Sequence, residues 1–239
     1  MRVRPKDGVH FEGEGLANRF GQALCEEQAT SIKEILEAFE FFQAVRKFVL
    51  RPHMADICSG HGLVGILFAL FERKVESVTL IDQAQPGSYA RILAAADRIG
   101  PWAREKVHFR ISPLRDAETV VQGGDLVPGT GLLGVHACGS LTDQILEWAI
   151  RLEGPLAVLP CCRQHRQHAA PEVLKRELGG DLAIDVHRTY ALDHAGYQVR
   201  WKKIPEVITP MNRVLIGVPR APASAPTEGV QAGTPVDAR

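Results

Sequence analysis

A glycine-rich segment between residues 55 and 65 carries the residue types best suited to bind a charged nucleotide. It reads Ala55-Asp56-Ile57-Cys58-Ser59-Gly60-His61-Gly62-Leu63-Val64-Gly65. Gly60 and Gly62 allow a tight turn and a close approach of the backbone to a ligand, and Gly65 lets the next helix pack against the preceding strand. The spacing of these three glycines also fits the dinucleotide fingerprint, so the glycines alone do not select one nucleotide.

The carboxylate of Asp56 distinguishes between the candidate ligands. It precedes the glycines, where it would repel a pyrophosphate but attract the ammonium and sulfonium groups of S-adenosyl-L-methionine. Asp82 follows Gly60 at the distance where an acid accepts the two ribose hydroxyls, and Gln83 is expected on the same edge. Ser112, after the third expected strand, is predicted near the adenine. The predicted cofactor-binding residues are Asp56, Cys58, Ser59, Gly60, Gly62, Leu63, Asp82, Gln83, Ser112, His136, Ala137 and Cys138.

A second group of polar residues follows two later apolar runs. His136 and Cys138 come after one run, and Cys161 and Cys162 come after the next. Because ligands bind outside the carboxyl ends of the strands in an open parallel sheet, both groups are expected beside the cofactor. One interpretation gives these residues a chemical role, with His136 as a base or orienter of the methyl acceptor. The predicted catalytic residues are His136, Cys161 and Cys162.

Two other interpretations of this group stay open. The cysteines and the histidine are also the kinds of side chain that a core buries for packing alone. A metal site would add His165 and His168 to the set, but the ligand spacings of structural zinc sites are missing. We therefore predict no metal.

The elements around these residues are expected to alternate between strands and helices. The apolar pattern predicts strands at 54–58, 78–81, 107–111, 132–136 and 156–159, and helices at 63–71, 88–99 and 142–152. Further helices are predicted at 171–178 and 182–195, and further strands at 197–204 and 213–218. Such alternation indicates an α/β fold with right-handed crossovers, and the short connection between the last two strands is typical of an antiparallel pair. We predict a Rossmann-like, seven-stranded, mainly parallel sheet with an antiparallel last strand.

The two ends of the chain differ from this core. Residues 26–50 have apolar positions at helical spacing, with Ser31 and Glu34 as a capping box and Pro52 as the stop, whereas residues 1–22 have a weak pattern. Ala, Pro, Gly, Ser and Thr dominate the last residues, which are expected to be disordered. We predict an N-terminal helical extension at 1–50, a core domain at 51–219 and a disordered tail at 220–239.

The composition narrows the class of protein. The 239 residues include 28 basic and 28 acidic side chains, so the chain lacks the strongly basic total of many nucleic-acid-binding proteins. Five cysteines, two of them adjacent, make a poor disulfide framework. The first ten residues lack an apolar signal core, and no apolar run approaches the roughly 20 residues that span a bilayer. We expect a cytoplasmic protein with no membrane partner, and its oligomeric state stays open.

Four motifs resemble those of a known methyltransferase family. The segments are 56–62, 136–143, 159–162 and 209–213, and together they span about residues 54–218. The family includes the tRNA acceptor-stem 2′-O-methyltransferase and related methyltransferase-like proteins. The resemblance implies a class I methyltransferase fold and S-adenosyl-L-methionine as the cofactor, with RNA as the acceptor. The zinc-binding elements that precede the catalytic domain of the tRNA enzyme have no counterpart in residues 1–50, where Cys25 stands alone.

Basic residues after the fifth strand either meet phosphates or form solvated surface, and Trp201 among them either stacks on a base or packs against the protein. The set comprises Arg163, Arg166, Arg188, Arg200, Lys202, Lys203 and Arg213. Two other functions remain: an NAD(P)-dependent oxidoreductase that uses the same glycine loop, and a non-catalytic cofactor-binding module.

Overall fold

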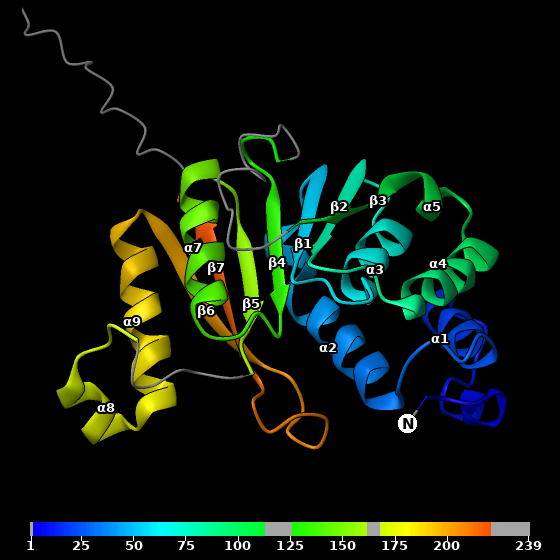
Figure 1. Ribbon diagram of the computed structural model, residues 1–239, viewed down its shortest axis with the longest axis horizontal. Helices are drawn as coiled ribbons and strands as arrows, with labels where there is room; N and C mark the ends of the chain where they lie inside the picture. Colours follow the sequence, from blue (N-terminus) through cyan, green and yellow to red (C-terminus); the bar gives the residue numbers. More distant parts are fainter. Residues whose placement is uncertain (1, 113–125, 162–167, 221–239) are drawn as a thin grey trace, which may run out of the picture.

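A seven-stranded sheet forms the centre of the protein (Figure 1). The computed structural model describes residues 2–112, 126–161 and 168–220. The strand order is β3-β2-β1-β4-β5-β7-β6, and β1 to β5 are parallel, whereas β7 runs antiparallel to both of its neighbours. The strands are β1 (His53–Ile57), β2 (Ser77–Asp82), β3 (Val107–Ile111), β4 (Gly131–Val135), β5 (Leu156–Leu159), β6 (Tyr197–Lys203) and β7 (Arg213–Pro219). The predicted Rossmann-like sheet with its antiparallel last strand is confirmed.

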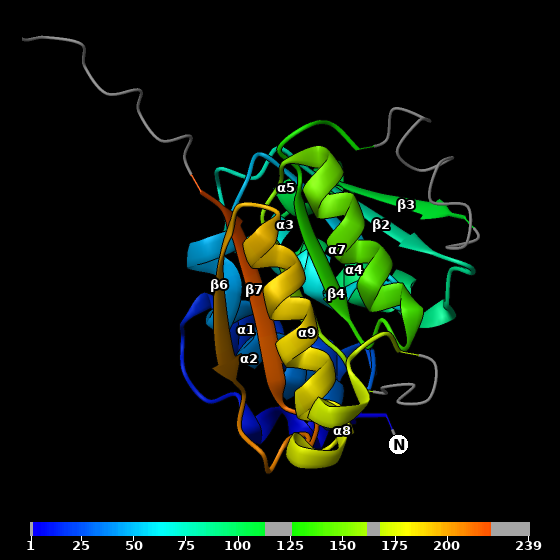
Figure 2. The ribbon, with the colours of Figure 1, turned by 90° about the vertical axis from the view of Figure 1, so that its left-hand side faces the viewer.

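Helices cover both faces of the sheet (Figure 2). One face carries α1 (Leu16–Glu26), α2 (Ile32–Val49), α3 (Leu63–Phe71), α4 (Gly87–Ile99) and α5 (Trp102–Lys106). The other face carries α7 (Ser140–Leu152) and α9 (Gly180–His194), with α8 (Glu172–Leu178) beside α9. Because side chains alternate along a strand, a strand contributes side chains to the cores on both faces of the sheet. In β1, Met54 packs into the α2–α3 core, and Ala55 packs into the α7 core. Among the described helices, none is long and apolar enough to cross a membrane.

The N-terminal region contains two elements that were not predicted, a 3-10 helix (Pro5–His10) and helix α1. The buried residues Phe20, Ala23 and Leu24 of α1 recur at helical spacing. A Cβ on Gly21 would lie 2.3 Å from the Phe11 ring, so the buried face of α1 needs a glycine there. The predicted capping box of α2 is confirmed, since Ser31 and Glu34 each accept the backbone N–H of the other. Helices α1 and α2 share one apolar core with α3, and the division into domains stays a prediction.

Gly65 lets the start of α3 lie directly against strand β2. A Cβ on Gly65 would lie 2.4 Å from Cδ2 of Leu80 and 3.0 Å from Cγ1 of Val78. We therefore expect Gly65→Ala to lower the free energy of unfolding by about 1–3 kcal/mol, the usual cost of overpacking a core. Gly87→Ala, in the first turn of α4, is the matched control because a Cβ there meets no atom within 4 Å. Urea unfolding measures both variants, and a Gly65→Ala midpoint at or above that of the unsubstituted protein would contradict this packing.

Candidate functional site

A cavity of about 180 Å³ opens where strands β1 and β4 end. In chain order, β2 and β3 are added on one side of β1, and β4 and β5 then follow on the other side. This reversal between β1 and β4 is the topological switch point, where open α/β sheets bind their ligands. The walls of the cavity come from α2, from the end of β1 and its glycine turn, from the start of α3 and from the end of β4.

The turn after β1 uses left-handed backbone at three positions. Cys58, Gly60 and Gly62 have φ angles of +58°, +53° and +74°. A Cβ on Gly60 would meet no atom within 4 Å, so this glycine leaves open space on the side of the cavity. A Cβ on Gly62 would lie 2.4 Å from Cδ1 of Leu80, so this glycine serves packing. The two glycines that sequence reasoning treated alike therefore have different roles.

Asp56 lines the cavity with a carboxylate that is only 2% exposed. Its Oδ2 accepts the backbone N–H of Gly65 at 3.0 Å, in the first turn of α3. Burial raises the pKa of Asp56 to about 7, the hydrogen bond from Gly65 opposes this rise, and the charge of Asp82 adds to it. The buried acid therefore gains and loses its proton close to neutral pH, and a nearby cation would favour its charged form.

Asp82 holds the glycine turn in place from the end of β2. Its Oδ2 accepts the N–H of Gly60 at 2.7 Å, and its Oδ1 accepts the N–H of Gln83 at 2.6 Å. The N–H of the buried Ser112 is donated to the backbone oxygen of Asp82 at 2.9 Å, which ties the ends of β2 and β3 together. Asp82, Gln83 and Ser112 lie outside the set of residues that line the cavity, whereas Ser59 and Leu63 belong to it.

Helix α2 contributes two carboxylates that sequence reasoning did not place in the site. Glu34 Oε1 lies 3.8 Å from Nε2 of His61, and Glu37 Oε2 lies 2.8 Å from Nε2 of His136. The hydrogen bond from His61 lowers the pKa of Glu34 well below its usual range, and Thr30 and Ser31 add to this effect. All four of these acidic and histidine side chains line the cavity. The available signal was an acid at position 37, within the apolar stripe of α2.

The predicted catalytic residues lie on two neighbouring strand ends. His136 follows β4 with a left-handed φ of +61°, and its side chain is 39% exposed. Ala137 is buried, and Sγ of Cys138 lies 2.7 Å from Sγ of Cys161 after β5. Neither Cys138 nor Cys161 lines the cavity.

The remaining cysteines and histidines restrict the chemistry that His136, Cys138 and Cys161 could perform together. Cys162 lies outside the described residues, as does His165. Burial raises the pKa of the Cys58 thiol to about 12, and the charges of Asp82, Asp56 and Cys138 add to it. Cys58 is therefore neutral at physiological pH and is no nucleophile there. Within the described part of the chain, no three His, Cys, Asp or Glu side chains group to hold a metal ion.

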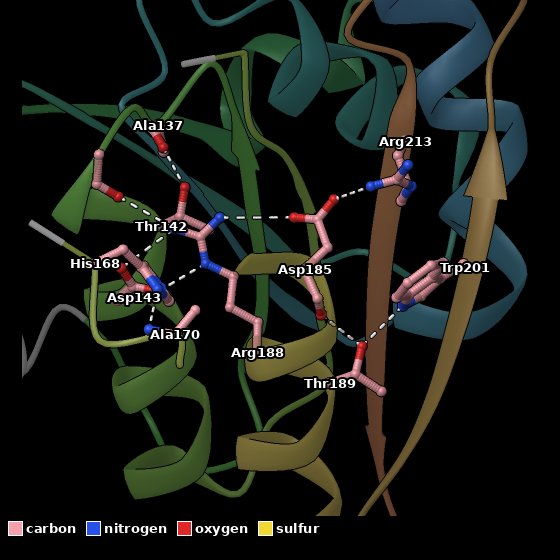
Figure 3. A network of polar contacts seen from close by, with 11 residues as sticks. Ala137, Thr142, Asp143, His168, Ala170, Asp185, Arg188, Thr189, Trp201 and Arg213 are labelled. Atoms are coloured by element: carbon pink, nitrogen blue, oxygen red, sulfur yellow. Dashed lines mark hydrogen bonds and ion pairs between the residues drawn. The ribbon is translucent and has the colours of Figure 1, made fainter. Parts of the chain in front are cut away.

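The interpretation of Arg188 as a phosphate contact is wrong. Its side chain is 2% exposed and binds Asp143 through Nε at 2.7 Å and Nη2 at 3.2 Å (Figure 3). Arg213 binds Asp185 at 2.5 Å and stacks on the ring of Trp201, whose Nε1 donates to Thr189. These contacts link α7, α9, β6 and β7 and leave neither arginine free for a phosphate.

The remaining cations of the predicted set are more accessible. Arg200, Lys202 and Lys203 are exposed on strand β6, at the edge of the sheet, although Arg200 and Lys202 lie over the ring of Phe48. The segment from Arg163 to Arg166 lies outside the described residues.

The fold and the cavity define a Rossmann-like α/β protein with an acidic pocket at its switch point. No family model matches the chain. Glutathione S-transferase C-terminal domain-containing proteins of Homo sapiens and Macaca fascicularis are each 25% identical over 203 residues, which cover 70% of this chain and 30% of theirs. The chain thus spans about a third of the length of these curated relatives.

Solved structures share the fold at low sequence identity. A Corynebacterium glutamicum protein is 14% identical, with a TM-score of 0.50 and coverage of 89% of this chain and 94% of that one. A SAM-dependent methyltransferase from Aquifex aeolicus is 15% identical, with a TM-score of 0.45 and coverage of 76% and 90%. At these identities the similarity shows the fold alone.

Proposed function

We propose that this protein is an S-adenosyl-L-methionine-dependent methyltransferase whose cofactor lies in the cavity at the ends of β1 and β4. The observation that carries the proposal is the charge of the cavity. Among the described residues that line it, Glu34, Glu37 and Asp56 are acids, and none is lysine or arginine. This lining suits a ligand with ammonium and sulfonium charges and disfavours the pyrophosphate of a dinucleotide. When bound, the cofactor supplies a methyl group activated by a positively charged sulfur.

The residues around the cavity fit the parts of this cofactor. Asp56 supplies a buried negative charge for the cationic amino-acid end, and Gly60 leaves room for the ligand beside the turn. Asp82 accepts one backbone N–H on each carboxylate oxygen. Each oxygen keeps further lone pairs, so both can also accept a ribose hydroxyl.

Asp82→Asn is expected to weaken S-adenosylhomocysteine binding by about 10-fold or more. The amide keeps one acceptor oxygen for the glycine turn but replaces the other acceptor with a donor, which loses a hydrogen bond to a charged group worth roughly 1.5–3 kcal/mol. Isothermal titration calorimetry measures the affinity, and thermal melting shows that the variant is folded. Asp97→Asn is the matched control, because Asp97 lies on α4 and binds Arg104 at the surface. Equal affinities of the Asp82 and Asp97 variants would contradict the ribose role.

The same titration separates the alternative functions. Binding of NAD(H) without binding of S-adenosylhomocysteine would favour an oxidoreductase. Cofactor binding without methyl transfer to RNA, protein or small-molecule pools would favour a non-catalytic module.

RNA is the proposed acceptor, in line with the resemblance of the motifs. Strand β6 is antiparallel to β7, which is antiparallel to β5, so the carboxyl end of β6 lies at the same sheet edge as the cavity. The exposed Lys202 and Lys203 lie at that end and suit a polyanion. Incubation with radiolabelled S-adenosyl-L-methionine and total lysate tests the acceptor. Label that RNase removes supports RNA, and label that only protease removes overturns it. A cytoplasmic location stays a prediction.

A further inference from the structure

The carboxylate of Glu37 is placed to act on His136 across a long separation in the chain. The two residues are 99 positions apart, yet Glu37 Oε2 and His136 Nε2 lie 2.8 Å apart. Helix α2 brings the acid over the end of β4, and both residues line the proposed cofactor cavity. Nδ1 of His136 has no hydrogen bond among the described residues, and the ring is partly exposed. One nitrogen is therefore held, and the other is available to a ligand.

The burial and the backbone strain of the Glu37–His136 pair are energetically unfavourable, which a purely structural contact would not require. Glu37 is 3% exposed, and its Oε1 has no partner at hydrogen-bond geometry within the described part of the chain, although the Thr209 hydroxyl lies close enough to favour the charged carboxylate. Buried polar atoms without a partner are rare in folded proteins. His136 also has a left-handed backbone, which non-glycine residues seldom adopt and which clusters at functional sites. A buried carboxylate with one unpaired oxygen and a histidine with a strained backbone thus line the same cavity.

The charge state of Glu37 suits this contact. Burial alone would raise the pKa of Glu37, but the hydrogen bond and charge of His136 outweigh it, and Lys33 and Thr209 add to the lowering. The pKa therefore lies below its ordinary value, and Glu37 is a carboxylate at neutral pH. A carboxylate that accepts Nε2–H fixes the neutral imidazole with Nδ1 as the acceptor and stabilises the imidazolium once a proton arrives.

We propose that Glu37 is a positioning residue for His136, which takes the proton from the methyl acceptor. This inference rests on the proposed function. In the step, the acceptor's bond to hydrogen breaks, the proton goes to Nδ1 of His136, and the freed electron pair forms the new bond to the methyl carbon. The carbon–sulfur bond breaks with its electrons kept by sulfur, which turns the sulfonium into a thioether. The acceptor class is thus a group that must lose a proton to react, in contrast to a lone pair that is already free.

Glu37→Gln tests the proposal, because it keeps the size of the side chain and removes its charge. NMR of the His136 imidazole nitrogens, assigned with His136→Gln, reports which ring nitrogen carries the proton. We expect the Nε2–H tautomer to lose its preference in Glu37→Gln, because a neutral amide accepts this N–H more weakly than a carboxylate. In the lysate transfer assay, the maximal rate should fall by roughly 10- to 100-fold. The affinity for S-adenosylhomocysteine should fall by less than the maximal rate, because Glu37 is one of three acids that line the cavity.

Controls separate this role from general changes of charge. Glu40→Gln removes a charge from the exposed side of α2, one turn further on, and should change neither the His136 tautomer nor the rate. The other charged or titratable groups near the pair stay in place in both variants: Lys33, Glu34, Asp56, Cys58, His61 and Cys138. His136→Gln should lower the rate at least as far as Glu37→Gln does. Thermal melting confirms that each variant is folded.

Three results would overturn the proposal. The His136 tautomer could stay unchanged in Glu37→Gln, or it could change while the maximal rate stays the same. The affinity for S-adenosylhomocysteine could instead fall steeply with the maximal rate unchanged, which would make Glu37 a cofactor ligand. Failure of the proposed function looks different, because the unsubstituted protein would then bind no S-adenosylhomocysteine and transfer no label, and the inference would fall with it.

Discussion

Asp56→Asn is expected to weaken S-adenosyl-L-methionine binding by about 10- to 100-fold while making the free protein more stable at neutral pH. The amide oxygen can still accept the N–H of Gly65, so the start of α3 keeps its partner. The negative charge is lost from the cavity wall. A unit charge about 6 Å from a cation contributes roughly 1–3 kcal/mol at the effective dielectric of a partly buried site, which corresponds to the expected loss of affinity.

The gain in stability follows from the titration of Asp56. Its folded pKa of about 7 lies above the ordinary value of 3.8, because burial disfavours the charge. The folded state therefore binds more protons than the unfolded state between these values, and this contribution to stability is lost as the pH rises through 7. Asparagine carries no charge to bury. The stability difference between Asp56→Asn and the unsubstituted protein should thus grow from near zero below pH 4 to roughly 4 kcal/mol at pH 8.

The pH dependence of cofactor affinity should reflect the same protonation of Asp56. Because the cationic ligand favours the charged carboxylate, affinity for S-adenosyl-L-methionine should fall by up to about tenfold for each pH unit below 7 in the unsubstituted protein. Asp56→Asn should lack this dependence. Calorimetry at pH 6 and 8 and urea unfolding at pH 4 and 8 provide both measurements. A variant that binds the cofactor as tightly as the unsubstituted protein would remove the electrostatic basis of the proposed function.

Arg188→Met should lower the free energy of unfolding by about 1.5–3 kcal/mol, because it removes charge-assisted hydrogen bonds to Asp143 and leaves a backbone carbonyl without its donor. Arg188 is fully enclosed and binds Asp143 through two nitrogens, and its Nη2 also donates to the carbonyl of Gly139 at 3.3 Å (Figure 3). Asp185 lies 3.9 Å away on the other side and also binds Arg213. Methionine fills a similar volume, so the loss measures the hydrogen bonds to Asp143 and to the backbone oxygen of Gly139, while Asp143 keeps solvent and His168 beside it.

A surface arginine supplies the matched control for this substitution. Arg220 binds Asp193, and both side chains are about half exposed, so Arg220→Met should cost at most about 1 kcal/mol. Urea unfolding compares the two variants directly. None of the described residues that line the cavity belongs to the Arg188 network, so Arg188→Met should bind S-adenosylhomocysteine normally at a temperature where it stays folded. If both variants lost the same small amount, the network between α7 and α9 would have no structural role.

Much of the fold could be predicted from the sequence because its signals are local. The predicted bounds of β3, α3 and β5 agree with the structure at both ends, and most other elements differ by one or two residues. Apolar runs, glycines and prolines mark these segments without reference to distant parts of the chain. The glycine turn with Asp56 could be found for the same reason, since its residues are neighbours in sequence. Helix α1 was missed because it follows a Gly-rich, polar stretch, although Phe20, Ala23 and Leu24 recur at helical spacing within it.

Local patterns in the sequence are enough to predict the order of most strands and helices and the position of an acid beside a glycine turn. Which charges meet depends on how the elements pack in three dimensions. Glu37 meets His136 from 99 residues away, and Arg188 meets Asp143 from 45 residues away. A charged residue in a helical pattern indicates solvent unless a partner compensates for its burial, and that partner comes from another element. Because the energy of a charge depends on distances in space, the partners of Glu37 and Arg188 were set by the packing of α2 and α9 on the sheet.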